Sequence, residues 1–357
     1  MTSVAMPAAR GATSAALLTR FALLAAATAL AFLLELAVGT VRIPFSDVVS
    51  ILSGGASTDE SWRTIVQTVR LPRALTAATG GAALGASGLV LQTLFRNRLA
   101  GPWLLGVTGG ARLGVALMIV AVSWSGYFLP AQLGIPGSVG VALSASVGAL
   151  GALLIMALAA RRVGTVSLLL LGVMITFLAT GASSVLMHLV SEDQGRVWEA
   201  WNDGNFGGVT WANLRVLLPL LLLGTLLAVA LMKSLDALTL GERYAESMGV
   251  SVRRIRWVAL AAVALLSGAT TAFCGVVAFL DIAVPQIARR IIASTEHRFL
   301  MPATLLLGAA LAMYADLLAH VPIGNRILHL NAITSVLGAP VVIWMLLRKS
   351  GAANGDT

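Results

Sequence analysis

The sequence predicts an all-α polytopic membrane protein, and both its composition and its apolar runs lead to that class. Hydrophobic residues make up 58% of the 357 residues and the mean hydropathy is +0.91, whereas only 11% of the residues are charged. Soluble proteins contain about 25% charged residues. Apolar runs of roughly 18 residues or more recur along the chain, each long enough to cross a bilayer as a helix. Because barrel strands alternate apolar and polar residues in short segments, these continuous runs argue against a β-barrel.

The apolar runs predict about ten transmembrane helices, of which the eighth is the shortest. The spans cover residues 17–38, 72–95, 103–122, 138–160, 166–190, 212–233, 257–278, 280–294, 302–320 and 332–348. Arg10 and Arg20 precede an apolar run from Phe21 to Leu34, which resembles a secretory signal. The run can be extended to the first span, from Leu17 to Val38. It is long enough to span, however, and no small-x-small cleavage site ends it, so we expect a retained first helix.

Positive charge predicts how the chain is oriented in the membrane. The net charge is +9, from 24 Lys and Arg against 15 Asp and Glu. When the ten spans are threaded in order, most Lys and Arg fall on the side of the N-terminus, and loops rich in these residues are usually cytoplasmic. We therefore expect one transmembrane domain over 1–357, with cytoplasmic tails at 1–16 and 349–357. No basic patch with interleaved aromatic residues occurs, so nucleic-acid binding is not expected.

Small residues at helical spacing predict a tightly packed bundle. The second span contains Gly81 and Gly85, and glycines four residues apart let helix backbones approach closely in lipid. The span 166–190 is rich in small and weakly polar residues, which predict either the wall of a transport pathway or simple helix packing. The pathway candidates on this span are Gly172, Thr176, Thr180, Ser183 and Ser184.

One polar stretch, LGERYAESMGVSVRRIR at residues 240–256, interrupts this apolar chain. Translocon scales put each Asp, Lys or Arg at a helix centre at a cost of about 2.5–3.5 kcal/mol, so residues 234–256 are predicted to form a cytoplasmic loop. Thr239 and Glu242 fit a capping box, and Gly249 fits a helix stop. Together they predict a nine-residue helix over 240–248.

The predicted helix has one apolar stripe, because Leu240, Tyr244 and Met248 recur at every fourth position. Helices shorter than about 12 residues are marginally stable alone in water, so the stripe must pack against something. Two kinds of partner fit this pattern. One is the protein's own helix bundle or the lipid surface, and the other is a separate cytoplasmic protein.

This loop resembles the cytoplasmic coupling segment of the FecCD family, the permeases of iron-siderophore and cobalamin ABC importers. The family's Gly-Glu, Ala and Leu-Gly-Val positions fall here, with Met in place of Leu, on Gly241, Glu242, Ala245, Met248, Gly249 and Val250. Further segments resemble the family in the same order between residues 65 and 348. They are RLPR at 70–73, LFRNRLAGPWLLGVTGG at 94–110, GVVAFLDIAVPQIAR at 275–289, HRFLMPA at 297–303 and LGAPVVIWMLLR at 337–348.

The sequence also departs from the family pattern, and the departures leave its cargo open. The substituted positions are Arg98 for Pro, Gly101 for Asp, Arg112 for a small apolar residue, Asp281 for Gly and Gln286 for His. In addition, residues 325–330 extend beyond the shortest family form. The roles of Asp281, Arg112 and this insertion do not follow from the resemblance.

No Gly-Lys-Ser/Thr motif occurs, so the chain has no phosphate-binding P-loop and is not expected to be an enzyme. The resemblance implies the ABC type II importer permease fold of cobalamin permeases, in the inner (plasma) membrane. It implies three partners: a second permease chain, identical or different; two copies of an ATPase subunit carrying ATP and Mg; and a periplasmic or lipid-anchored substrate-binding protein. The residues implied to contact the ATPase are Leu240, Gly241, Glu242, Arg243, Tyr244, Ala245, Met248 and Gly249.

The resemblance also implies that arginines on the outer side pair with glutamates of the binding protein. These arginines are Arg70, Arg73 and Arg326. Arginine suits this role because its planar guanidinium binds a carboxylate through two parallel hydrogen bonds. The alternative is ordinary positioning of long side chains at the membrane interface.

Few residues carry other chemistry. The four histidines lack metal-ligand spacing, so we expect no cofactor or metal bound by this chain, and any iron would travel inside its chelator. The resemblance implies import of a ferric siderophore by alternating access, with cobalamin and haem as alternatives. The alternative of a different class is an ion-coupled secondary transporter, in which Asp281 and Asp316 would carry protons. In the importer, Asp316 would be structural and Asp281 would line the pathway at the outer gate.

Overall fold

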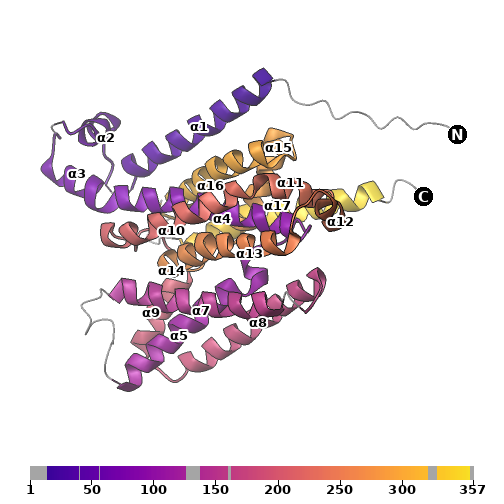
Figure 1. Ribbon diagram of the computed structural model, residues 1–357. Helices are drawn as coiled ribbons and strands as arrows, with labels where there is room; N and C mark the ends of the chain where they lie inside the picture. The colour runs from indigo at the N-terminus through magenta and orange to yellow at the C-terminus, as the bar shows by residue number, and fades with distance from the viewer. Residues whose placement is uncertain are drawn as a thin grey trace.

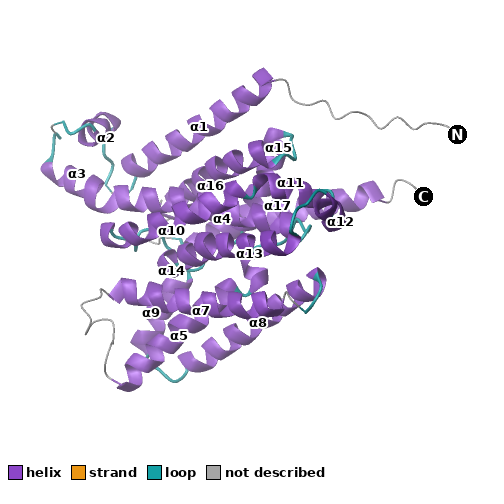
Figure 2. Cartoon of the chain, viewed as in Figure 1, coloured by secondary structure: helices purple, strands orange, loops and turns teal. Residues whose placement is uncertain are grey.

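The structure is a computed structural model that describes residues 14–39, 41–55, 57–125, 137–159, 162–320 and 328–353. Every regular element in these residues is a helix (Figure 2). In chain order the elements are α1 (Ser14–Ala37), α2 (Phe45–Leu52), α3 (Glu60–Thr64), η1 (Ile65–Arg70), α4 (Leu71–Leu94), η2 (Pro102–Leu105), α5 (Val107–Ser125), α7 (Gly137–Ala159), α8 (Thr165–Met187), α9 (Glu192–Asn202), α10 (Trp211–Ala230), α11 (Met232–Thr239), α12 (Glu242–Ser247), α13 (Val252–Val263), η3 (Ala264–Gly268), α14 (Ala269–Cys274), α15 (Leu280–Ile292), α16 (His297–His320) and α17 (Leu330–Ala353).

Within the described residues, eight helical segments are long and apolar enough to cross a membrane, which confirms the predicted class. They are Ala15–Ala37, Glu60–Leu94, Val107–Trp124, Val139–Ala159, Ser167–Met187, Trp211–Ala230, Val252–Cys274 and His297–His320. The other two predicted spans, 280–294 and 332–348, correspond to α15 and α17. α15 has 13 residues and is shorter than a full span, whereas α17 has 24 residues.

Besides α12 of the polar loop, the short helices α2, α3 and α9 lie outside the predicted spans. α9 begins with a capping box, in which Ser191 and Gln194 each bond to the other's backbone N–H. The second predicted span starts at residue 72, but the helix continues upstream to Glu60 through the π-helical turn η1. A search for apolar runs passes over such polar and amphipathic segments, so they were not predicted.

α4 is the central helix of the bundle and packs against α16, α15 and α10 (Figure 1). Its glycines allow this packing. A Cβ at Gly81 would overlap the Gly308 carbonyl oxygen, and a Cβ at Gly88 would overlap the Asp281 carbonyl oxygen. These helices therefore meet backbone to backbone, as the spacing of small residues predicted.

α5, α7, α8 and α9 form a second group of helices, drawn below the central ones in Figure 1. α5 packs against both α7 and α8. Glycines again mark the contact, since a Cβ at Gly114 would overlap the Ser144 carbonyl oxygen. The side of α8 that faces away from the bundle exposes large apolar side chains such as Phe177 and Leu178. Such a surface suits lipid or another membrane subunit rather than water.

The chain leaves helical geometry over 275–279, between α14 and α15. Gly275 has a φ of +72°, a conformation that favours glycine. The backbone of this segment is satisfied by Asn331 of α17, which donates to the Val276 carbonyl at 2.7 Å and accepts from the Ala278 N–H at 3.0 Å. Irregular backbone at membrane depth needs such partners because lipid supplies none.

Candidate functional site

The polar loop at 240–256 contains a helix, α12, which is shorter than predicted. It begins at Glu242, because Gly241 takes a φ of +120° and no side chain caps the helix. The predicted capping box is wrong. The Thr239 hydroxyl donates instead to a backbone carbonyl three residues earlier, and the Glu242 carboxylate pairs with Arg256 at 3.1 Å.

The apolar stripe of this loop is exposed. Leu240, Tyr244 and Met248 are 64%, 54% and 58% exposed, whereas Ala245 of the same helix is fully buried. Gly249 ends the helix as predicted, with a φ of +81°. The helix bundle formed by the described residues therefore does not cover the stripe. The other partners considered from the sequence, the lipid surface and a separate cytoplasmic protein, stay predictions.

Hydrogen bonds tie the base of this loop to two long helices. The Asp236 carboxylate in α11 accepts from the His297 backbone N–H at 3.0 Å and lies 2.6 Å from His297 Nδ1. On the other side of the buried imidazole, Nε2 lies 2.9 Å from the Thr93 hydroxyl of α4. α11, α16 and α4 are thereby connected. The sequence carried no signal for this contact, because the partners of His297 lie 61 and 204 positions away.

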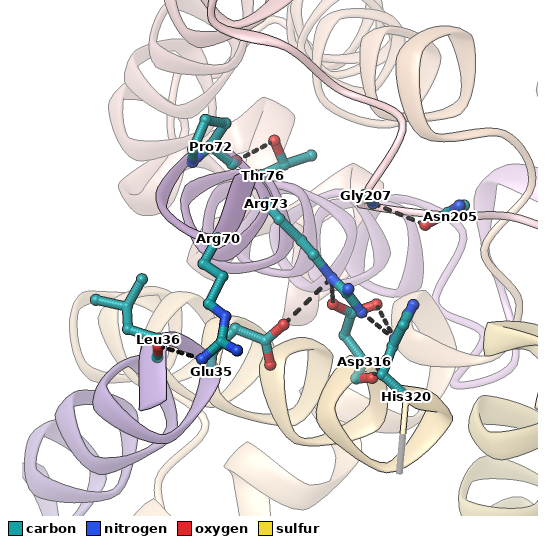
Figure 3. A network of polar contacts seen from close by, with 10 residues as sticks. All are labelled: Glu35, Leu36, Arg70, Pro72, Arg73, Thr76, Asn205, Gly207, Asp316 and His320. Carbon is teal, nitrogen blue, oxygen red and sulfur yellow. Dashed lines mark hydrogen bonds and ion pairs between the residues drawn. The ribbon is translucent and has the colours of Figure 1, made fainter. Parts of the chain in front are cut away.

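Near the opposite end of α4, buried charged side chains join α1, α4 and α16 (Figure 3). Arg73 Nε lies 2.5 Å from Asp316 Oδ2 and 3.4 Å from Glu35 Oε1. The far side of the same guanidinium contacts His320 Nδ1. Both carboxylates are buried, so each depends on the arginine for compensation of its charge. We call these four residues the ion network. Neither Glu35 nor His320 was predicted as a site residue. Glu35 could have been found, because a lone acid within an apolar span is unusual and often functional.

Arg70 is also buried, with an exposed fraction of 7%. Its guanidinium donates to the Leu36 carbonyl at 2.8 Å (Figure 3). It also donates to the Val41 carbonyl, so it holds residues on both sides of the end of α1. In this position it offers no free guanidinium, and docking to a binding protein is not supported for Arg70. Docking by the partly buried Arg73 stays a prediction. Arg326 lies outside the described residues.

The pathway candidates on α8 divide between two environments. Thr176 and Ser183 are buried and donate to backbone carbonyls one turn earlier, at 3.0 and 2.7 Å. Gly172 lies against η2, where a Cβ would overlap a backbone oxygen. These three positions therefore favour the helix-packing interpretation. Thr180 is half-buried and Ser184 is exposed, so they are the two that remain accessible.

Asp281 lies in the first turn of α15 and is 7% exposed. Its backbone packs against Gly88, six residues before the end of α4 at Leu94. At a rise of 1.5 Å per residue it is roughly 9 Å from that end, which lines a groove together with Tyr244 of the polar loop. Asp281 therefore lies in the half of the bundle nearer this loop, and its place at an outer gate stays a prediction.

Four departures from the family pattern meet in this region. Asp281 faces Gly101 so closely that a Cβ at 101 would overlap the Oδ2 atom of the carboxylate. One turn further along α15, Gln286 donates to Gln92 Oε1 at 2.7 Å and to the Arg98 carbonyl at 2.9 Å. Residues 188 positions apart in the sequence are thus direct neighbours.

Comparison with known proteins places this geometry in a family. The model of the FecCD transport family matches residues 27–348. The vitamin B12 import system permease protein of Vibrio cholerae serotype O1 is 37% identical over 289 residues, which cover 80% of this chain and 83% of that protein. The hemin transport system permease protein of Yersinia pestis is 35% identical over 301 residues, covering 84% and 88%. The ferric enterobactin transport system permease protein of Escherichia coli K12 is 34% identical over 327 residues, covering 89% and 91%.

A solved structure has the same fold. A metal-chelate type ABC transporter in an inward-facing conformation superposes with a TM-score of 0.79, covering 92% of this chain and 98% of that one at 24% identity. The fold is thus that of an ABC importer permease. With the family match over most of its length, the chain belongs to the FecCD transport family and is a permease subunit of an ABC importer.

Proposed function

We propose that this permease imports a ferric siderophore across the inner membrane by alternating access, driven by two copies of a partner ATPase. The observation that carries the proposal is the stripe of Leu240, Tyr244 and Met248, which is more than half exposed on a loop anchored to the bundle. An exposed apolar stripe on a short helix matches the binding of a helix in a groove of another protein.

The anchoring of the loop supports a mechanical role. α12 follows α11, and Asp236 of α11 is bonded to His297 at the start of α16, which in turn contacts Thr93 of α4. An ATPase that holds α12 would therefore pull on two of the central helices at once. Movement of these helices against the rest of the bundle is what alternating access requires.

Further partners follow from the same assignment. A second permease chain would cover the apolar outer side of α8, where Phe177 and Leu178 are exposed. A substrate-binding protein would deliver the cargo at the end of the bundle that holds the ion network, with Arg73 as its contact. ATP and Mg would be bound by the ATPase.

The cargo is inferred from chemistry shared by relatives. Relatives of this chain are named for vitamin B12, hemin and ferric enterobactin, and the structural neighbour is described as metal-chelate type. All are bulky metal chelates, and two of the three named cargoes contain iron, which favours a ferric chelate. Cobalamin is the second candidate, because the vitamin B12 permease is 37% identical to this chain.

Uptake measurements test both parts. The permease would be expressed with its ATPase and binding protein in a host that lacks its own importers, and supplied with ⁵⁵Fe-siderophores, labelled haem or labelled cobalamin. ATP-dependent accumulation of ⁵⁵Fe is the expected result, and accumulation of cobalamin or haem alone would overturn the cargo. Uptake that follows the proton gradient without ATP would favour the secondary transporter instead.

A further inference from the structure

A cavity of about 320 Å³ lies between α4, η2, the start of α5 and the segment that joins α14 to α15. This volume is at the lower end of the range of small-molecule sites, roughly 300–1,000 Å³. Its walls are mainly apolar, with Leu84 and Val277 among them, and they include two aromatic side chains, Trp103 and Phe279. Hydroxyl groups such as that of Thr271 also line it, and the single ionisable group in the lining is Asp281.

The Asp281 carboxylate is buried without a cationic partner among the described residues. It accepts hydrogen bonds only from backbone N–H groups, that of Ile282 at 3.0 Å and that of its own residue. The nearer of the two arginines on the same helix, Arg289, is eight residues away, about 12 Å along the axis, and donates to Gln92 Oε1 at 2.6 Å. A buried carboxylate without a counter-charge is strongly unfavourable, so this group must either take up a proton or pair with a cation supplied from outside the chain.

Gly101 makes room for this carboxylate on the other side. A Cβ at position 101 would overlap Asp281 Oδ2, so any other residue there would displace the group. The carboxylate extends from α15 and lines the cavity.

The lining selects among ligand classes. An anion would be repelled by the carboxylate, and a neutral apolar molecule would leave it uncompensated. A hard metal ion needs about six oxygen ligands, whereas no cluster of three metal-ligating side chains occurs in the described part of the chain. A protonated amine on an apolar group matches every part of the lining. The carboxylate pairs with the ammonium, the aromatic rings attract the same charge, and the apolar group packs against the apolar side chains.

We propose that this cavity binds a protonated amine attached to an apolar group, with Asp281 as the residue that recognises the charge. Trp103 lies between the cavity and the surface of α8 that faces away from the bundle. It lines the cavity, is partly exposed, and contacts Phe177 edge to face with ring centroids 6.4 Å apart. In the importer, a point that rests on the proposed function, this makes Asp281 a specificity-determining residue for cargo that carries an amine.

Binding to the purified chain in lipid nanodiscs tests the site directly. The probe is phenethylammonium, compared with its neutral and acidic analogues 2-phenylethanol and phenylacetate, after subtraction of the signal from empty nanodiscs. A charge-assisted contact is worth about 1.5–3 kcal/mol, which corresponds to about ten- to hundred-fold in affinity. Phenethylammonium should therefore bind wild-type protein tighter than the alcohol by about that factor. Equal affinity for the two would overturn the proposal without any variant.

Variants locate the effect at Asp281. D281N preserves the shape of the side chain and should bring the affinity for phenethylammonium down to that for the alcohol, while binding of the alcohol stays unchanged. The matched control is E246Q, which removes an exposed acid of α12 far from the cavity lining. Unchanged phenethylammonium binding by a folded D281N protein would sink the assignment. These measurements need no ATPase, so they remain informative if the proposed transport function fails.

A transport assay identifies the source of the amine. Ferrioxamine B carries a free alkylammonium tail, and its N-acetyl derivative lacks that charge but keeps the ferric centre. If the amine belongs to the cargo, wild-type protein should import the first faster, and D281N should import both equally. If wild type imports both equally while phenethylammonium still binds, the site serves a free amine.

Discussion

Replacing Tyr244 and Met248 together with aspartate is expected to abolish ATPase binding and transport while leaving the permease inserted. Both side chains are about half exposed, at 54% and 58%, so about half of their surface remains to be buried by a partner. Full burial of a large apolar side chain is worth about 1.5–3 kcal/mol, so half of it for two side chains gives about 1.5–3 kcal/mol. Desolvating two new carboxylates without partners adds at least about 1–3 kcal/mol.

The combined loss is therefore about 2.5–6 kcal/mol, or at least about sixty-fold in the dissociation constant. The assay is the affinity of the purified permease for its ATPase, together with uptake in cells. Y244F/M248L is the matched control, because it keeps the apolar stripe and should bind and transport like wild type. Wild-type affinity of the double aspartate variant, at normal membrane levels, would refute the assignment of this stripe to the ATPase.

Three further predictions concern the interior. D316A removes the carboxylate closest to the partly buried Arg73, so we expect a loss of about 3–5 kcal/mol in the free energy of unfolding, measured as a lower midpoint of thermal unfolding in detergent. An unchanged midpoint would contradict a structural ion network. Gly81→Leu should prevent the close packing of α4 on α16 and reduce the monodisperse protein recovered by size exclusion. Gly181→Leu, at a position with open space, should not, and equal losses would argue against backbone contact. H297A should leave ATPase binding intact but lower uptake, because the loop base loses its connection to α4; normal uptake would contradict a coupling role.

Much of the fold follows from local pattern. A long apolar run can satisfy its backbone in lipid only as a helix, so the positions of most spans were predicted to within a few residues. The polar loop was predicted for the converse reason, since its charges exclude it from the bilayer. The apolar stripe could be predicted from the four-residue spacing of Leu240, Tyr244 and Met248 alone. The exact start of α12 was missed, because the Glu242 carboxylate pairs with Arg256 of α13 instead of capping its own helix.

The sequence by itself therefore determined the membrane class, the polar loop with its apolar stripe and the absence of a P-loop motif, which all depend on residues close together in the chain. Only the tertiary structure decided what the buried polar groups do. Arg73 and Asp316 are 243 positions apart, yet their contact forms the centre of the buried ion network. Likewise, Gly101 and Asp281 are neighbours because α15 packs against the turn before η2. Burial and pairing of charge depend on which helices pack together, and hydropathy along one segment does not encode that choice.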